Sequence, residues 1–240
     1  MATMSKTHAM RRSVGTAIIL VVVAFAISLS PDMQQSVIKP NPDAAAPLQS
    51  TAPKGDAATA LGTLEIKGRA AKTGYSRAQF GDGWLRQGTC DMRNIILNRD
   101  LQQPVVDDVC KVQSGVLDDP YTGQKVTFMR GASSSALVQI DHVVALSDAW
   151  QKGAQQLTRE QRIQMANDPL ELLAVDGAAN QKKSDGDAAT WLPDNKAFRC
   201  DYIARQIAVK QKYSLWVTTA ERDTMARVLQ ACPGQPLPAE

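Results

Sequence analysis

The stretch QIDHVVALSDAW, residues 139–150, places an aspartate beside a histidine at the point where an apolar run gives way to a helical pattern. The chain contains 2 histidines in 240 residues. The other one, His8, lies in an N-terminal tail that we expect to stay outside the fold. Any imidazole chemistry in the folded domain therefore depends on His142.

The segments around this stretch predict a strand, a long connection, a second strand and a short helix. Strands are expected at residues 125–129, 137–140 and 170–175, and helices at 147–154, 158–167, 178–185 and 196–212 and from residue 218. Thr158 and Thr218 each begin a capping-box spacing, with Gln161 and Glu221 three residues later. This order of elements predicts one α+β domain.

The N-terminus predicts export. Residues 14–29 form an uncharged apolar run of 16 residues, preceded by Lys6, Arg11 and Arg12. Such a segment, residues 1–30, fits either a cleaved signal peptide or a retained membrane anchor, and both place the body of the protein outside the cytoplasm. It is then secreted or anchored on the outer face of the cytoplasmic membrane. Residues 31–63, rich in Pro and Ala, predict a disordered linker, and residues 64–240 the folded domain.

Four cysteines agree with an exported protein, and none forms a Cys-x-x-Cys pair. An even number in an exported chain favours disulfides over metal clamps. Four cysteines allow three pairings, of which we favour the sequence-local one, Cys90 with Cys110 and Cys200 with Cys232. The alternative is that one or both pairs remain as free, buried thiols.

The predicted strands and helix suggest a hydrolytic site built from Asp141, His142 and Asn180. Phosphodiester hydrolysis needs a base for water and an electrophile for the phosphate. A neutral imidazole of His142 suits the first role, and one divalent ion bound by Asp141 and Asn180, Mg²⁺ in preference to Mn²⁺, suits the second. Lys183, one turn after Asn180, is placed to touch the phosphate.

These segments resemble a known family. The sequences IDHVVALSDAW and NDPLELLAVDGAANQKKSDGDAATWLP, together with CDMRNIILNRDL, LDDPYTG and RCDYIARQIAVK, resemble exported HNH (His-Me finger) endonucleases, whose core is similar to the C-terminal domain of GmrSD restriction endonucleases. The resemblance covers roughly residues 75–233. It implies a ββα-metal core wrapped by additional helices, with His142 as general base and Asp141 and Asn180 as metal ligands.

One position departs from the pattern of that family. The residue that braces the loop carrying the histidine is usually Asn, and here Glu171 occupies the corresponding place. Either the Glu171 carboxylate braces the loop, or Asn167 does so, or the site is weakened. Because this residue orients and does not react, we expect activity to survive.

Several of these residues can also be interpreted as purely structural. Asn180 also fits a helix N-terminal cap. Arg93 is a candidate phosphate contact or the partner of a nearby carboxylate, and the tryptophans are expected to be core anchors.

Residues 64–240 carry 22 Lys and Arg against 21 Asp and Glu, so bulk charge (22 − 21 = +1) does not indicate a nucleic-acid partner. We predict an endonuclease for nucleic acid, DNA in preference to RNA, with low sequence specificity. The alternatives are an inactive nucleic-acid-binding domain of the same fold and a hydrolase of other phosphoesters.

Overall fold

At the centre of the fold, two antiparallel strands lead into a short helix. The computed structural model describes residues 56–132 and 134–238. Strand β6 (Val138–His142) pairs with β7 (Leu172–Asp176) in a register that sets His142 opposite Leu172. Helix α5 (Gly177–Lys183) follows β7 directly, so the predicted strand, strand and helix are confirmed.

The turn from β7 into α5 depends on one glycine. A Cβ atom on Gly177 would lie 2.2 Å from the carbonyl oxygen of Ala136, so no other residue fits without moving the backbone. The Gly177 N–H donates to the Leu137 carbonyl at 2.9 Å, and the Asp176 side chain caps the helix by accepting from the Ala179 N–H. These contacts hold the start of α5 against the start of β6.

A three-stranded antiparallel sheet packs beside this centre. Its strands are β3 (Leu101–Val106), β4 (Val112–Asp118) and β5 (Lys125–Met129), in the order β3-β4-β5. Helix α2 (Met92–Asp100), whose N-cap is Asp91, follows a short hairpin of β1 (Arg86–Gln87) and β2 (Cys90–Asp91). Buried side chains of α2, the sheet, β6 and β7 form one apolar cluster. Strand β5 was predicted, whereas β3 and β4 were not.

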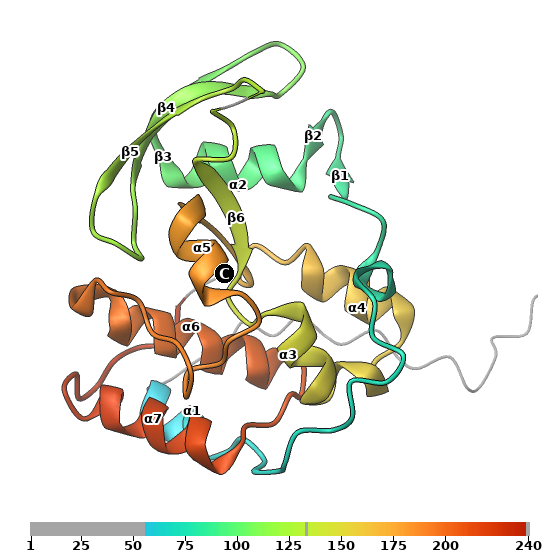
Figure 1. Cartoon of the computed structure of the whole chain (residues 1–240), viewed down its shortest axis with the longest axis vertical. Helices are drawn as coiled ribbons and strands as arrows, with labels where there is room; N and C mark the ends of the chain where they lie inside the picture. The colour runs from blue at the N-terminus through green and yellow to red at the C-terminus, as the bar shows by residue number, and fades with distance from the viewer. Residues whose placement is uncertain (1–55, 133, 239–240) are drawn as a thin grey trace, which may run out of the picture. The chain divides into compact units, whose positions relative to one another are not determined.

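The remaining helices enclose the other side of β6 (Figure 1). They are α1 (Ala57–Leu61), α3 (Leu146–Gln151), α4 (Arg159–Ala166), α6 (Arg199–Lys212) and α7 (Thr219–Leu229), with the 3₁₀ turns η1 (Arg77–Phe80), η2 (Ala154–Gln156) and η3 (Lys196–Phe198). Both predicted capping boxes form, at the starts of α4 and α7. The expected α+β class is confirmed.

A set of charges, buried except for Arg69, joins these helices, and we call it the ion cluster. Its members are Arg69, Asp148, Lys152, Asp187, Lys210 and Glu221. The ammonium of Lys152, fully buried, lies between 2.6 and 2.9 Å from three carboxylates. Three cations and three anions balance, as the burial of charge requires.

The two predicted disulfides form, Cys90 with Cys110 and Cys200 with Cys232. The start of the domain differs from the expected residue 64, because Ala57, Ala60 and Leu61 of α1 are buried in the main core. The predicted export segment, residues 1–30, and residues 31–55 of the predicted linker lie outside the described residues. Across the described part, no helix combines the length and apolar character that crossing a bilayer requires.

Candidate active site

His142 ends β6 and is 7% exposed. Its Nε2 lies 3.0 Å from the carbonyl oxygen of Ala166, which can only accept a hydrogen bond, so we assign the ring proton to Nε2. Burial, with a further contribution from the charge of Arg77, lowers the pKa of His142 to about 3. The imidazole is therefore neutral near pH 7, and its Nδ1 carries a free lone pair.

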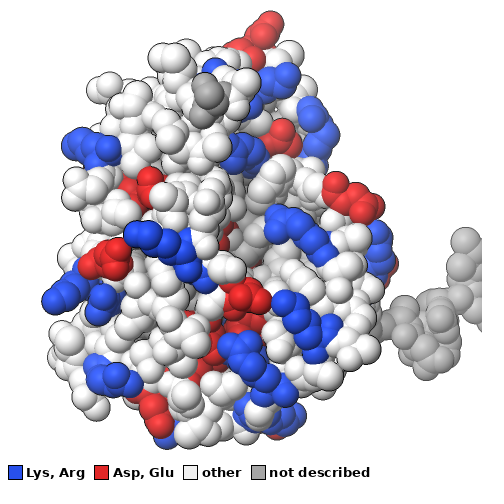
Figure 2. Space-filling model, in the orientation of Figure 1, with Lys and Arg blue, Asp and Glu red and all other residues white. Residues whose placement is uncertain are grey.

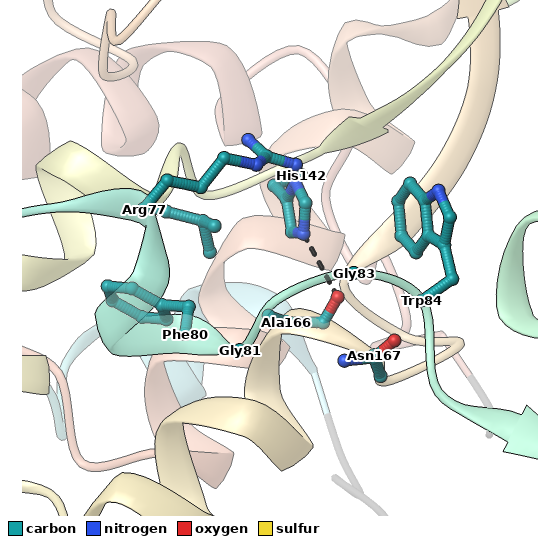
Figure 3. A pocket seen from close by; sticks show the side chains of 9 residues that line it. Arg77, Phe80, Gly81, Gly83, Trp84, His142, Ala166 and Asn167 are labelled. Carbon is teal, nitrogen blue, oxygen red and sulfur yellow. Dashed lines mark hydrogen bonds between the residues drawn. The ribbon is translucent and has the colours of Figure 1, made fainter.

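Arg77, which the sequence did not single out, and Trp84, which was expected only as a core anchor, lie against this ring (Figure 3). Trp84 stacks on His142 with ring centroids 5.8 Å apart and planes within 7° of parallel. Arg77, on η1, lines the same cavity of about 190 Å³. The Gly-rich turn before Trp84 was the available signal, because Gly81 has a φ of 100°, a backbone conformation that favours glycine. Trp84 is half-buried: it packs against the apolar cluster of α2, the sheet, β6 and β7, in keeping with the prediction, and it also forms a wall of the cavity.

The Asp141 carboxylate is already held on both oxygens. Its Oδ1 lies 3.0 Å from the Lys183 ammonium, and its Oδ2 accepts from the Tyr121 hydroxyl at 2.5 Å. Burial raises the pKa of Asp141, and Lys183 and Tyr121 oppose that shift.

Lys183 is placed differently from our prediction. Its ammonium is fully buried and also donates to the backbone carbonyl of His142 at 2.8 Å. The α5 register accounts for this, since Lys183 points toward β6 and away from solvent. A direct phosphate contact by Lys183 does not fit the position of its ammonium.

Asn180 lies one turn earlier on α5 and is half-buried. Its amide nitrogen donates to Gln139 Oε1 at 2.9 Å, which leaves Oδ1 facing no donor among the described residues. Because Asp176 caps the helix, the alternative reading of Asn180 as the N-cap is wrong. Asp141, His142 and Asn180 all line one cavity of about 510 Å³.

Glu171 contacts the chain immediately after His142. Its backbone carbonyl accepts from the Val143 N–H at 2.9 Å, and its Oε2 accepts from the Val144 N–H at 3.1 Å. Burial raises the pKa of Glu171 well above its usual range. Of the two residues that we considered for this brace, Glu171 is the one that touches the loop.

Asn167 instead holds the segment that carries Trp84. Its Oδ1 accepts from the Leu85 N–H at 2.8 Å, and its amide donates to the carbonyl of Ile163 in α4. Since Ala166 binds His142, Asn167 links the histidine's acceptor to the wall of the cavity.

Arg93 lies near the opposite end of β6. Its guanidinium donates to the carbonyls of Ser135 and Val138, at 3.3 and 3.2 Å, and it lines neither of the cavities that contain His142. Val138 begins the strand that His142 ends, so Arg93 braces the entry to β6. A phosphate contact at the candidate site does not fit its position.

A family model described as "GmrSD restriction endonucleases, C-terminal domain" matches residues 91–228. The chain belongs to this family. An "Uncharacterized secreted protein" from Arthroderma benhamiae is 36% identical over 174 residues, which cover 72% of this chain and 82% of the relative. No solved structure matches the chain. Arg77 and Trp84 lie before the first residue of the family match.

The donors of this GmrSD-type domain suit a hard cation with few protein ligands. Asp141 and Asn180 offer oxygen atoms to one cavity, and each carboxylate oxygen of Asp141 has two lone pairs, so its present partners do not use them all. Mg²⁺ fits such a set, because it commonly keeps several waters and binds one or two protein carboxylates. Among residues 56–132 and 134–238, no three His, Cys, Asp or Glu side chains gather into a metal-binding group, so a zinc-like ligand set is not formed there.

Proposed function

We propose that this protein is a metal-dependent endonuclease that hydrolyses nucleic-acid phosphodiester bonds outside the cytoplasm. Its membership in a family named for restriction endonucleases supports the nuclease class. The observation that carries the proposal is the state of His142, a buried and neutral imidazole in one cavity with Asp141 and Asn180. We propose DNA as the substrate, cut with little sequence preference, because residues 56–132 and 134–238 contain no recognition module separate from the domain that holds the site.

His142 acts as the general base in this proposal. Its Nδ1 accepts a proton from a water molecule as the water oxygen attacks phosphorus. The hydrogen bond from Nε2 to Ala166 keeps the ring in the tautomer that leaves Nδ1 free. The parallel face of Trp84 limits rotation of the ring and excludes solvent from one side.

Asp141 and Asn180 would bind the ion. A divalent cation there would stabilise the negative charge that develops on the phosphate and on the leaving oxygen. Lys183 and Tyr121 fix the orientation of the Asp141 carboxylate, and Gln139 fixes that of the Asn180 amide. We assign Lys183 to positioning and Glu171 to support of the loop after His142.

An export address completes the proposal. The disulfides suit an oxidising compartment, and the relative from Arthroderma benhamiae is named as secreted. Release into the medium and anchoring on the outer face of the membrane both agree with the predicted N-terminal segment.

Nicking of supercoiled plasmid DNA in Mg²⁺ or Mn²⁺ tests the activity. We expect the wild type to convert supercoiled plasmid to open circles, and expect EDTA or His142→Ala to abolish the conversion. His8→Ala, which changes the other histidine of the chain, is the matched control and should retain activity. Cleavage that persists in EDTA or in His142→Ala would refute the mechanism.

One observation favours a second function. The Lys183 ammonium forms an ion pair with the Asp141 carboxylate, which is the group proposed to bind the metal ion. A domain that binds nucleic acid without cutting it would keep this ion pair and would need no metal ion. That alternative predicts plasmid binding in EDTA with no nicking at any Mg²⁺ or Mn²⁺ concentration. The gel assay above, run with a mobility-shift lane, separates the two functions.

A further inference from the structure

Arg77 is a cation without a protein partner beside the candidate base. Arg77 is exposed and lines both cavities that His142 lines. Within the described part of the chain it has no hydrogen bond or ion pair. The other cations near the larger cavity are neutralised, since Lys72 pairs with Asp185 and Lys183 pairs with Asp141. Arg77 therefore supplies the uncompensated positive charge there.

The backbone that carries Arg77 is held firmly. Arg162, which is buried, donates to the Gln79 backbone carbonyl and to Gln79 Oε1, both at 3.0 Å. Phe80, at the end of η1, is buried edge-to-face against Tyr75 and Trp150. The fixed backbone keeps the guanidinium within reach of His142, and Figure 3 shows it beside the imidazole.

An arginine in this position suits a phosphodiester. The guanidinium is planar, stays charged and presents paired N–H donors that match two oxygens of a phosphate. Figure 2 shows basic and acidic side chains interspersed over the face in view, so a broad basic patch does not account for phosphate binding on that face. The positive charge of Arg77 beside His142 is therefore the feature of this region that suits a phosphate.

Resting on the function proposed above, we propose that Arg77 contacts the non-bridging oxygens of the phosphodiester that is cut. His142 takes the proton of the attacking water, and Arg77 stabilises the charge that grows on those oxygens. Arg77 is then a catalytic residue supplied by a segment before residues 91–228, the part that the family model matches. Its contribution should appear in kcat more than in KM, because the negative charge is largest in the transition state.

Kinetics of Arg77→Gln and Arg77→Lys on a fluorescent DNA duplex test this assignment. We expect Arg77→Gln to lower kcat by about 10²–10³-fold, as loss of a single transition-state donor does elsewhere. Arg77→Lys should fall between it and the wild type, because lysine keeps the charge and loses the paired donors. The control is Arg159→Gln, which changes an exposed arginine outside both cavities. An Arg77→Gln enzyme that matches this control, or that changes only in KM, would overturn the assignment.

A binding measurement separates this proposal from the nuclease proposal. In EDTA, the slope of log affinity against log salt for the duplex should become shallower by about 0.9 in Arg77→Gln, as expected for one lost phosphate contact. If the wild type never cleaves, the nuclease proposal fails, and a shallower slope still supports the Arg77 contact with phosphate. A slope equal to that of the wild type would overturn the Arg77 contact in either case.

Discussion

The neutral state of His142 predicts a specific loss of stability in mild acid. The folded protein holds the pKa of His142 at about 3, whereas the unfolded chain has the ordinary value near 6.5. Because the folded pKa is the lower one, its stabilising effect is complete above pH 6.5 and declines as the pH falls toward 3. Each pH unit in that window costs about 1.4 kcal/mol, so lowering the pH from 7 to 5 should cost about 2 kcal/mol of unfolding free energy.

Urea unfolding of the wild type and of His142→Gln, at pH 7 and pH 5 in EDTA, measures this loss. Glutamine keeps a side-chain donor for the Ala166 carbonyl but does not titrate. Other groups titrate in both proteins, including Glu171, whose raised pKa acts in the opposite direction. The difference between the two pH dependences therefore isolates the imidazole, with EDTA keeping the comparison free of metal.

We expect the wild type to lose about 2 kcal/mol more than the variant between pH 7 and pH 5. Equal losses in the two proteins would mean that the folded state protonates His142 as readily as the unfolded chain does. The reasoning that makes His142 a neutral base with a free Nδ1 would then be wrong. An unchanged denaturant slope checks that both proteins unfold from comparable compact states.

Three further predictions concern the residues around the site and the framework that holds it. Glu171→Gln should change the unfolding free energy at pH 7 by less than about 1 kcal/mol, because glutamine keeps the shape of the side chain and an acceptor for the Val144 N–H and removes a carboxylate whose charged form burial disfavours. Glu171→Ala should cost about 1–3 kcal/mol by leaving that N–H unbonded, and equal costs for the two variants would contradict the acceptor role of Glu171. Lys152→Met should cost about 3–5 kcal/mol in urea unfolding, since it leaves three buried carboxylates without their shared cation, and a cost below about 1 kcal/mol would show that the ion cluster is not strongly coupled. Replacing Cys200 and Cys232 by alanine should lower the unfolding free energy by about 3–4 kcal/mol, the cost of releasing a cross-link over 32 residues, and thermal unfolding with and without reductant checks that this effect belongs to the disulfide.

The arrangement of the site also explains how a buried aspartate remains available to a cation. Lys183 and Tyr121 stabilise the charged form of Asp141 while no ion is present. Their contacts fix the carboxylate against β6, so an incoming ion meets oxygens that are already oriented. The same lysine holds the backbone of His142, which couples the geometry of the base to that of the ligand.

Local signals in the sequence sufficed for the central part of the fold. The strand that ends in Asp141 and His142 depends on neighbouring residues, as do the capping boxes at Thr158 and Thr218. Cysteine parity and short separations were enough for the disulfide pairing. Resemblance to a family then indicated which residues gather at the site.

Only the tertiary structure decided what surrounds those residues. The sheet strands β3 and β4 were missed because they are polar and half-exposed, and β3 contains a proline. The pairing of β3 with β4, and of β4 with β5, is what orders them. Lys183 was expected to face a phosphate, and the register of α5 against β6 turned it toward Asp141 instead.

Arg77 and Trp84 reach His142 from a segment far away along the chain, positioned by the packing of η1 on α4 and by the bond from Leu85 to Asn167. A sequence pattern records which side chains are available at a site and how nearby residues bend the chain. Which charge neutralises which, and which ring shields the base, depends on contacts between distant segments that form only when the whole domain packs.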